Sequence, residues 1–317
     1  MGLAGVASAL SSLSFDLPGH QSGKVRESWQ LPNDRRLLVT SDRLSAFDRV
    51  IGLVPHKGQV LNQLSAWWFE NTRDIVANHA IGLPDPNALI AVDATPLPVE
   101  VVVRGRLTGS TSTSVLPRYL DGERTLYGHE LPDGLEPHGP LPHPIITPTT
   151  KAAAGEHDQP TTAEEVAQSG LVDPTMWLEI QQIALQLFER GVAVADEVGF
   201  VLADTKYEFG VGPDGTLLLI DEVHTPDSSR YWPKVSLDRL LAEGKPPEGY
   251  DKEPVRLALG DLGYVGDGEV PELANEVWQQ TSDRYLELYE RITGDLFIPG
   301  VQPIEERIKA NLSAHLN

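Results

Sequence analysis

The stretch "LADTKYEFG" (residues 202–210) has the length of a β-strand but carries three charged residues. Side chains alternate between the two faces of a strand, so Asp204, Lys206 and Glu208 share one face. The residues between them, including Tyr207, occupy the other face. We therefore expect a strand that turns one face to the core and sets an acid, a base and an acid in a row on the other.

A hairpin partner for this strand follows directly along the chain. The turn sequence Gly-Pro-Asp-Gly (212–215) leads into "TLLLIDEV", and this pattern is typical of a β-hairpin. If Val211 pairs with Thr216, then Lys206 lies opposite Asp221, and cross-strand neighbours on one face are close enough to touch. The charged face is therefore predicted to gain a third carboxylate.

Three carboxylates and one ammonium on one face suit a hard divalent cation. Mg²⁺ in proteins takes one or two carboxylates together with phosphate oxygens. The alternative is a solvated sheet face whose charges pair with one another. Glu222 points away in this register, but the hydroxyl-rich segment that follows, "TPDSSRYW" with Arg230, favours a site.

Composition narrows the class of protein. The chain has 317 residues, 40% hydrophobic and 22% charged, which indicates a globular protein with more than one lobe. A net charge of −21 argues against a nucleic-acid partner, because nucleic acids are bound by clustered Lys and Arg. There is no cysteine and no apolar run of about eighteen residues, so we expect no disulfide, no thiolate zinc site and no membrane span. A cytoplasmic monomer or homodimer is the expectation.

The rest of the chain alternates strand-like and helix-like patterns. A hairpin is predicted within 22–55, a buried strand over 98–107, and a helix over about 173–198 that Asp173 caps. Residues 117–160, rich in Pro, Gly and His, are expected to form a long functional loop. Further helices are predicted over 58–79, 236–243, 253–261 and 271–293, and the first fifteen residues are expected to form a helix or a frayed extension.

Three further stretches carry cations that could meet an anionic ligand. Lys24 lies in "GHQSGKVRES", which does not match the phosphate-loop pattern but can cover phosphates as a hairpin turn. Arg104 precedes a Gly-Ser-Thr run, a combination that suits phosphate or carboxylate. Lys151 and Asp158 lie in the long loop without zinc-ligand spacing. Each stretch could equally be an ordinary loop or strand exit.

Seven stretches occur in an order that resembles one enzyme family. They are "SGKVRE", "SDRLSAFD", "KGQVLNQLSAWWF", "PVEVVVRGRLTGS", "TPTTKAAAGEHD", "LADTKYEFG" and "LIDEVHTPDSSRYW". Two are highly specific, the P-x-E-x-x-x-R-x-x-x-T-G-S run and D-T-K-Y-E-F-G. From about residue 22 to about residue 310 the chain is similar to the phosphoribosylaminoimidazole-succinocarboxamide synthases, or SAICAR synthetases, of purine biosynthesis.

The resemblance implies a fold and a reaction. The fold would be α+β, SAICAR synthetase-like and two-lobed, distantly similar to kinases and ATP-grasp enzymes, with ATP in the cleft. A β-rich N-terminal lobe would cover 21–105 after an extension of 1–20, and a larger α+β lobe, 106–317, would carry the metal hairpin. The enzyme would be an ATP-dependent amide ligase. It would join L-aspartate to the carboxylate of carboxyaminoimidazole ribotide (CAIR), giving SAICAR, ADP and phosphate through an acyl phosphate.

The resemblance also implies roles for individual residues. Glu208 and Asp221 match the family's Mg²⁺ positions, and Lys206 between them can steady the transferring phosphoryl group. The candidate catalytic residues are Lys206, Asp204 and Lys151. The ATP side would include Lys24, Val25, Arg26, Glu100, Val102, Glu208 and Asp221, with the strand around 100–103 lining the adenine pocket. The substrate side would include Ser45, Asp48, Arg104, Ser110, Lys151, Asp158, Asp204 and Arg230, of which Arg104, Ser110 and Arg230 would hold the ribotide 5′-phosphate.

Three departures from the family pattern lie on the substrate side. Ala153 stands where Glu is frequent, "QPTT" follows Asp158 in place of the usual ENIS, and Arg106 replaces a common aromatic residue. They keep a second hypothesis open, a paralogous ligase with another carboxylate or amine, for example in nucleoside natural-product biosynthesis. A third hypothesis, a binding or scaffold protein without catalysis, is disfavoured because every polar member of the predicted site is present.

Overall fold

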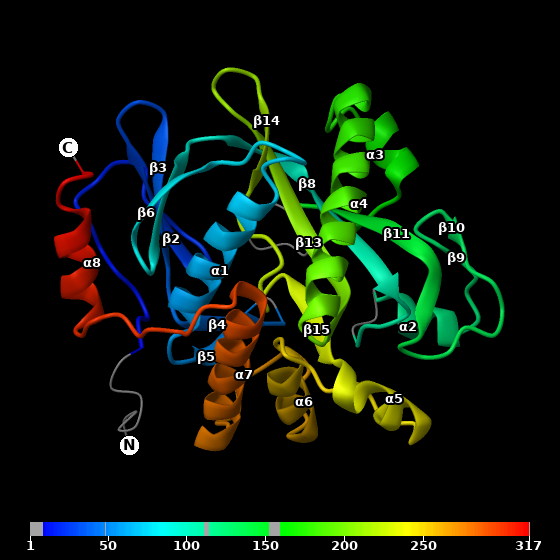
Figure 1. Ribbon diagram of the computed structural model, residues 1–317. Coiled ribbons are helices and arrows are strands. Elements are labelled where there is room, and N and C mark those ends of the chain that lie inside the picture. Colours follow the sequence, from blue (N-terminus) through cyan, green and yellow to red (C-terminus); the bar gives the residue numbers. More distant parts are fainter. Residues whose placement is uncertain (1–8, 48, 111–113, 152–158, 317) are drawn as a thin grey trace.

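A computed structural model describes residues 9–47, 49–110, 114–151 and 159–316 of the chain. Its strands form two main sheets, and helices lie between and around them (Figure 1). This mixture of helices and mainly antiparallel strands confirms the predicted α+β class. Two candidate residues, Asp48 and Asp158, lie outside the described residues.

The first sheet has five strands and the second has six. The first runs in the order β1 (Gln21–Ser22), β2 (Arg26–Leu31), β3 (Arg35–Thr40), β7 (Ala88–Val92) and β6 (Ala80–Asp85). The second runs β12 (Gln159–Pro160), β11 (Pro140–Thr150), β8 (Thr95–Arg106), β13 (Phe200–Val211) and β14 (Leu217–Ile220), with β15 (Ser229–Pro233) also on β13. Two small ribbons complete the described strands, β4 (Arg43–Ala46) with β5 (Arg49–Leu53) and β9 (Thr125–Leu126) with β10 (His129–Glu130).

The helices surround these sheets. They are α1 (Lys57–Asn71), α2 (Val115–Leu120), α3 (Ala163–Ser169), α4 (Pro174–Glu197), α5 (Lys234–Ala242), α6 (Glu253–Asp261), α7 (Asn275–Thr293) and α8 (Ile304–Leu312). α4 begins as predicted, because the Asp173 carboxylate accepts hydrogen bonds from the backbone N–H groups of Thr175 and Met176 and Pro174 occupies the first turn.

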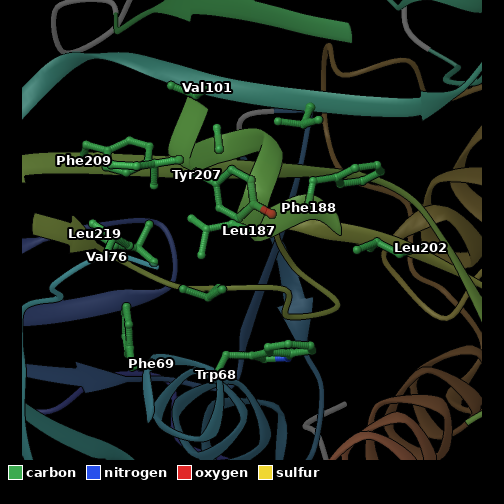
Figure 2. Packing of buried hydrophobic residues seen from close by; sticks show 14 of the residues in the cluster. Trp68, Phe69, Val76, Val101, Leu187, Phe188, Leu202, Tyr207, Phe209 and Leu219 are labelled. Atoms are coloured by element: carbon green, nitrogen blue, oxygen red, sulfur yellow. The ribbon is translucent and has the colours of Figure 1, made fainter. Parts of the chain in front are cut away.

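Strand β13 is central to the second sheet, since β8, β14 and β15 all pair with it. Its apolar face enters the main core. Tyr207 and Phe209 lie there in one cluster with Trp68 of α1 and Leu187 of α4 (Figure 2). The predicted two-faced strand is therefore confirmed, and its buried face leaves the charged face turned the other way.

Residues 117–160 do not form the long loop that we expected. They contain part of α2, the β9–β10 ribbon and the whole of β11, which pairs with β8 from Ile145 to Thr150. The strand β11 was not predicted because prolines, which are rare in strands, interrupt its sequence. The strand tolerates them because only its last residues, Thr149 and Thr150, pair with β12, so most of its outer edge needs no backbone donor.

Both ends of the described chain lie on the first sheet. Residues 9–15 are not helical, contrary to one of the expectations, and Leu10 and Leu13 are buried beside Trp29 of β2. Helix α8, which the sequence patterns did not predict, adds Ile308 and Leu312 to the same cluster (Figure 1).

The chain passes from one sheet to the other between Val92 of β7 and Thr95 of β8. The lobe boundary at residue 105 stays a prediction, and the sheet topology favours an earlier division. Within the described residues, no helix combines the length and apolar content needed to cross a membrane.

Candidate active site

Two cavities meet at the charged face of β13. The larger, of about 780 Å³, is walled by the loop 22–26 and by Glu208. The smaller, of about 230 Å³, is walled by Arg104 and Arg230. Lys206 lines both cavities, so it stands where their contents would meet.

Lys206 is held between two carboxylates. Its Nζ lies 2.7 Å from Glu100 Oε1 and also contacts Glu208, and these two acids face each other across β8 and β13. Lys151 reaches Glu208 from the end of β11. Burial alone would lower the pKa of Lys206, but Glu208 and Glu100 raise it above its usual value. Burial would raise the pKa of Glu208, but Lys206 and Lys151 hold it well below its ordinary range.

Arg26 ties the first sheet to the hairpin of the second. Its guanidinium contacts Asp221 and lies 3.0 Å from Glu222 Oε2. Burial raises the pKa of Asp221 to about 6, against the opposing effect of Arg26. Glu222, which we expected to point away, therefore belongs to the larger cavity together with Asp221.

The hairpin register differs by one residue from the predicted one. Val211 pairs with Leu217, not with Thr216. The physical reason is the turn: Gly212 already pairs with Thr216 through N–H···O=C, and Gly215 takes a left-handed φ of 87°. The connection is thus a three-residue loop with glycine in the left-handed position, not a four-residue turn.

A slip of one residue would carry Asp221 to the opposite face of a regular strand. This does not happen at Asp221, because the strand pairing ends at Glu208 and Ile220, one residue before it. Its own φ is +68°, so its side chain does not follow the alternation of a regular strand. The predicted pairing of Lys206 opposite Asp221 is wrong, yet both residues line the same cavity.

The smaller cavity is built for an anion. Arg104 and Arg230 both donate to one oxygen of Asp204, at 3.0 Å and 2.5 Å, and Arg104 also donates to Thr147 Oγ1 at 2.9 Å. Arg230 also lies 4.0 Å from Asp251 Oδ2, but five cations and three carboxylates line this cavity, so positive charge is in excess and the guanidinium groups keep spare N–H donors. Ser110 lies apart from Arg104, in a neighbouring cavity of about 230 Å³ that Arg230 also lines.

Most of the other candidate residues fall on these walls. Lys24, Val25, Ser45 and Glu100 line the larger cavity, and Val102 lines the smaller one.

A third cavity, of about 320 Å³, adjoins the larger one through Glu208 and Asp221. Apart from these acids its walls are mostly uncharged and include Leu38, Val92 and Ile220. The residues 100–103, which we expected around an adenine base, do not line it.

The carboxylates at the larger cavity suit Mg²⁺ only with help from a ligand. Within the described ranges, no three histidine or acidic side chains converge to form a complete metal site. Glu208 and Asp221 nevertheless line the same two cavities, and Mg²⁺ needs only one or two carboxylates when phosphate oxygens supply further ligands. The donor set therefore fits a metal that arrives with a phosphorylated substrate.

Sequence reasoning missed five of the charged residues on these walls: Glu222, Asp227, Asp251, Lys252 and Arg256. Glu222 was assigned to the wrong face by the register. Asp227 lies in the segment "TPDSSRYW", in which a role was assigned only to Arg230. The one available signal for Lys252 and Arg256 was their spacing of four residues at the start of a predicted helix.

Known proteins are similar to this chain in sequence and in fold. The family model described as SAICAR synthetase matches residues 20–273. A phosphoribosylaminoimidazole-succinocarboxamide synthase of Legionella pneumophila is 44% identical over 308 residues, covering 96% of this chain and 97% of that protein.

Two solved structures show the same likeness in three dimensions. The SAICAR synthase of Saccharomyces cerevisiae complexed with SAICAR has a TM-score of 0.78 at 28% identity, covering 92% of this chain and all of that one. A type-2 SAICAR synthetase in complex with ADP has a TM-score of 0.66 at 25% identity, covering 89% of this chain and 100% of that one. The order of the motifs, the fold that gathers them around one site and these matches agree, and the chain belongs to the SAICAR synthetase family.

Proposed function

We propose that the protein is an ATP-dependent ligase that joins L-aspartate to the carboxylate of CAIR, giving SAICAR, ADP and phosphate in purine biosynthesis. The observation that carries the proposal is the position of Lys206, which lines both a cavity with magnesium-type carboxylates and a cavity with two arginines. The names of the relatives support it, since one solved relative is complexed with SAICAR and another with ADP. A cytoplasmic location and a monomeric or dimeric state stay predictions.

ATP fits the larger cavity and its mainly uncharged neighbour. The triphosphate would lie under the loop 22–26, with Lys24 over it and Arg26 beside it. The base would enter the third cavity, because its walls offer apolar surface such as Leu38 and Ile220. This placement differs from the expected adenine pocket at residues 100–103. Bound Mg²⁺ would neutralise charge on the β- and γ-phosphates at Glu208 and Asp221.

CAIR fits the smaller cavity. Its 5′-phosphate would take the spare donors of Arg104 and Arg230, and Asp204, which both arginines hold in place, would face the ribotide. Its carboxylate would then point to Lys206, at the junction with ATP. Ser110 would extend the phosphate site on the far side of Arg230.

The chemistry needs two displacements. A CAIR carboxylate oxygen bonds to the γ-phosphorus as the bond to the bridging oxygen of ADP breaks, which turns a poor leaving group into phosphate. The amine nitrogen of aspartate then bonds to the acyl carbon, phosphate leaves, and the nitrogen loses a proton. Lys206 would hold the transferring phosphoryl group by charge, and the cations around it would make the approach of the two anions possible.

One assay tests the function and separates the alternatives. ADP release is followed with purified protein, Mg·ATP and CAIR, with and without L-aspartate. We expect release that depends strictly on aspartate, together with SAICAR formation. Release only with another amine or carboxylate would instead support the paralogous ligase, and no release under any condition would leave a binding protein.

Arg104→Ala is expected to raise KM for CAIR by about 10- to 100-fold, because one charge-assisted contact to the phosphate is lost. KM for ATP should change little, since Arg104 does not line the larger cavity. Steady-state kinetics with each substrate varied in turn give both constants. An unchanged KM for CAIR would contradict the phosphate assignment.

A further inference from the structure

Two cations at the junction of the cavities have no role in the reaction as described so far. We infer that Lys252 and Arg256 bind the carboxylates of the amino-acid substrate, which makes the junction a dicarboxylate subsite. This inference rests on the proposed function, because it assigns the third substrate to residues that neither ATP nor CAIR requires.

The start of α6 sets both side chains on one face. Asp251 Oδ1 accepts a hydrogen bond of 2.7 Å from the backbone N–H of Glu253, and Pro254 follows in the first turn. The backbone N–H of Arg256 donates to the carbonyl of Lys252 at 3.1 Å. Residues four apart on a helix are neighbours on its surface. The two cations are therefore presented together.

Their position matches the place where an amine must enter. Of the described residues, only Lys206, Asp227, Lys252 and Arg256 line both the larger and the smaller cavity. The larger cavity would deliver the phosphoryl group and the smaller one the acyl carbon. A dicarboxylate held by Lys252 and Arg256 would place its amine next to that carbon.

Arg256 has N–H donors to spare, whereas Lys206, which also faces both cavities, does not. In the described part of the chain, its guanidinium forms one ion pair, with Glu253 at 3.2 Å. Lys206 is shared by Glu100 and Glu208. The planar guanidinium fork matches a carboxylate with two parallel hydrogen bonds.

Asp227 holds Lys252 in place. Its carboxylate is already paired with two lysines, so it is not free to bind the amine of the amino-acid substrate. Its Oδ2 lies 2.8 Å from Lys57 Nζ and 3.2 Å from Lys252 Nζ, and Tyr285 donates to Oδ1 at 2.9 Å. The side chains of Lys57 and Asp227 are 0% and 2% exposed, so their charges cancel inside the protein. Burial would raise the pKa of Asp227, but Lys252 and Lys57 hold it down to about 2. Lys252 is thus oriented without losing its two remaining donors.

The test is the kinetics of Arg256→Gln, with all three substrates varied. We expect KM for L-aspartate to rise by about 10- to 100-fold, the usual cost of a lost charge-assisted contact, while KM for ATP and CAIR stays unchanged. Arg239→Gln is the matched control, because Arg239 on α5 also pairs with a glutamate one turn away, at 3.3 Å, but is exposed and lines neither cavity. A rise in KM for ATP or CAIR instead, or no rise at all, overturns the inference.

A second measurement does not depend on how much variant protein folds. L-Asparagine keeps the amine and α-carboxylate of aspartate but lacks the second negative charge. The ratio of kcat/KM for aspartate over asparagine should fall by at least about 10-fold in Arg256→Gln or Lys252→Gln relative to the wild type. Succinate should compete with aspartate in the wild type and more weakly in both variants. An unchanged ratio with unchanged succinate competition refutes the subsite. Failure of the wild type to form SAICAR would instead refute the proposed function.

Discussion

Asp221→Asn is expected to lower kcat by about 10³-fold or more at saturating substrates, with the fold intact. The change removes a negative charge from a site that offers few carboxylates to a metal, and losses of this size are typical when electrostatic stabilisation of a transition state is removed. ADP release at saturating Mg·ATP, CAIR and L-aspartate gives the value. A rate near that of the wild type would mean that the metal does not use Asp221.

Asparagine is the right replacement because of the backbone. Asp221 has a φ of +68°, where asparagine and aspartate are enriched among non-glycine residues, so the left-handed conformation is retained. The amide oxygen also remains available to Arg26 as an acceptor. Asp214→Asn is the matched control: it makes the same change in the same hairpin, at the exposed turn, where Asp214 accepts from the backbone N–H of Thr216 at 3.0 Å. The control should leave both kcat and the thermal midpoint unchanged.

Arg307→Met is expected to lower the free energy of unfolding by about 3–5 kcal/mol, because it leaves a buried carboxylate without its cation. Arg307 of α8 forms a two-point contact with Asp85 at the end of β6, at 2.9 Å and 3.1 Å, and the Asp85 side chain is 0% exposed. Arg307 also donates to Asn87 Oδ1 at 2.5 Å. The contact therefore fastens α8 to the first sheet.

Urea unfolding gives the free energy, provided that the m-value stays constant. Arg239→Met, which removes an exposed ion pair on α5, should cost no more than about 1 kcal/mol and serves as the control. The double variant Asp85→Asn with Arg307→Met should recover part of the loss, since no unpaired charge then remains buried. A loss in Arg307→Met as small as that of the control would show that the buried pair contributes no more than a surface pair.

Local patterns predicted the elements on which the site is built. Strand alternation placed Asp204, Lys206 and Glu208 on one face, and the Asp173–Pro174 start placed α4, because both features depend only on neighbours in the chain. The order of the motifs led us to assign the cations of both cavities to one site. Rules that depend on residues close together in the sequence could predict these parts of the molecule.

The failures depend on interactions that are distant in the sequence or on single backbone angles. The strand β11 could not be recognised because its prolines are tolerated only at an edge that the tertiary structure creates. The register of the hairpin turned on the φ of Gly215, and the direction of Asp221 on its own φ. The Lys57–Asp227 pair joins residues that are far apart in the sequence and that no local pattern connects. Its importance comes from the burial of both side chains, which the sequence does not show.

The closing of α8 over the first sheet has a consequence for synthesis on the ribosome. Trp29, Leu37 and Ile90 are made early, but the same apolar cluster is completed by Ile308 and Leu312. At usual elongation rates, roughly 10 to 40 seconds separate β7 from α8. During that interval the nascent first sheet exposes the part of its apolar face that α8 covers later, although Leu10 and Leu13 are already present. The sheet that is translated first is therefore expected to be among the last parts to reach its final packing.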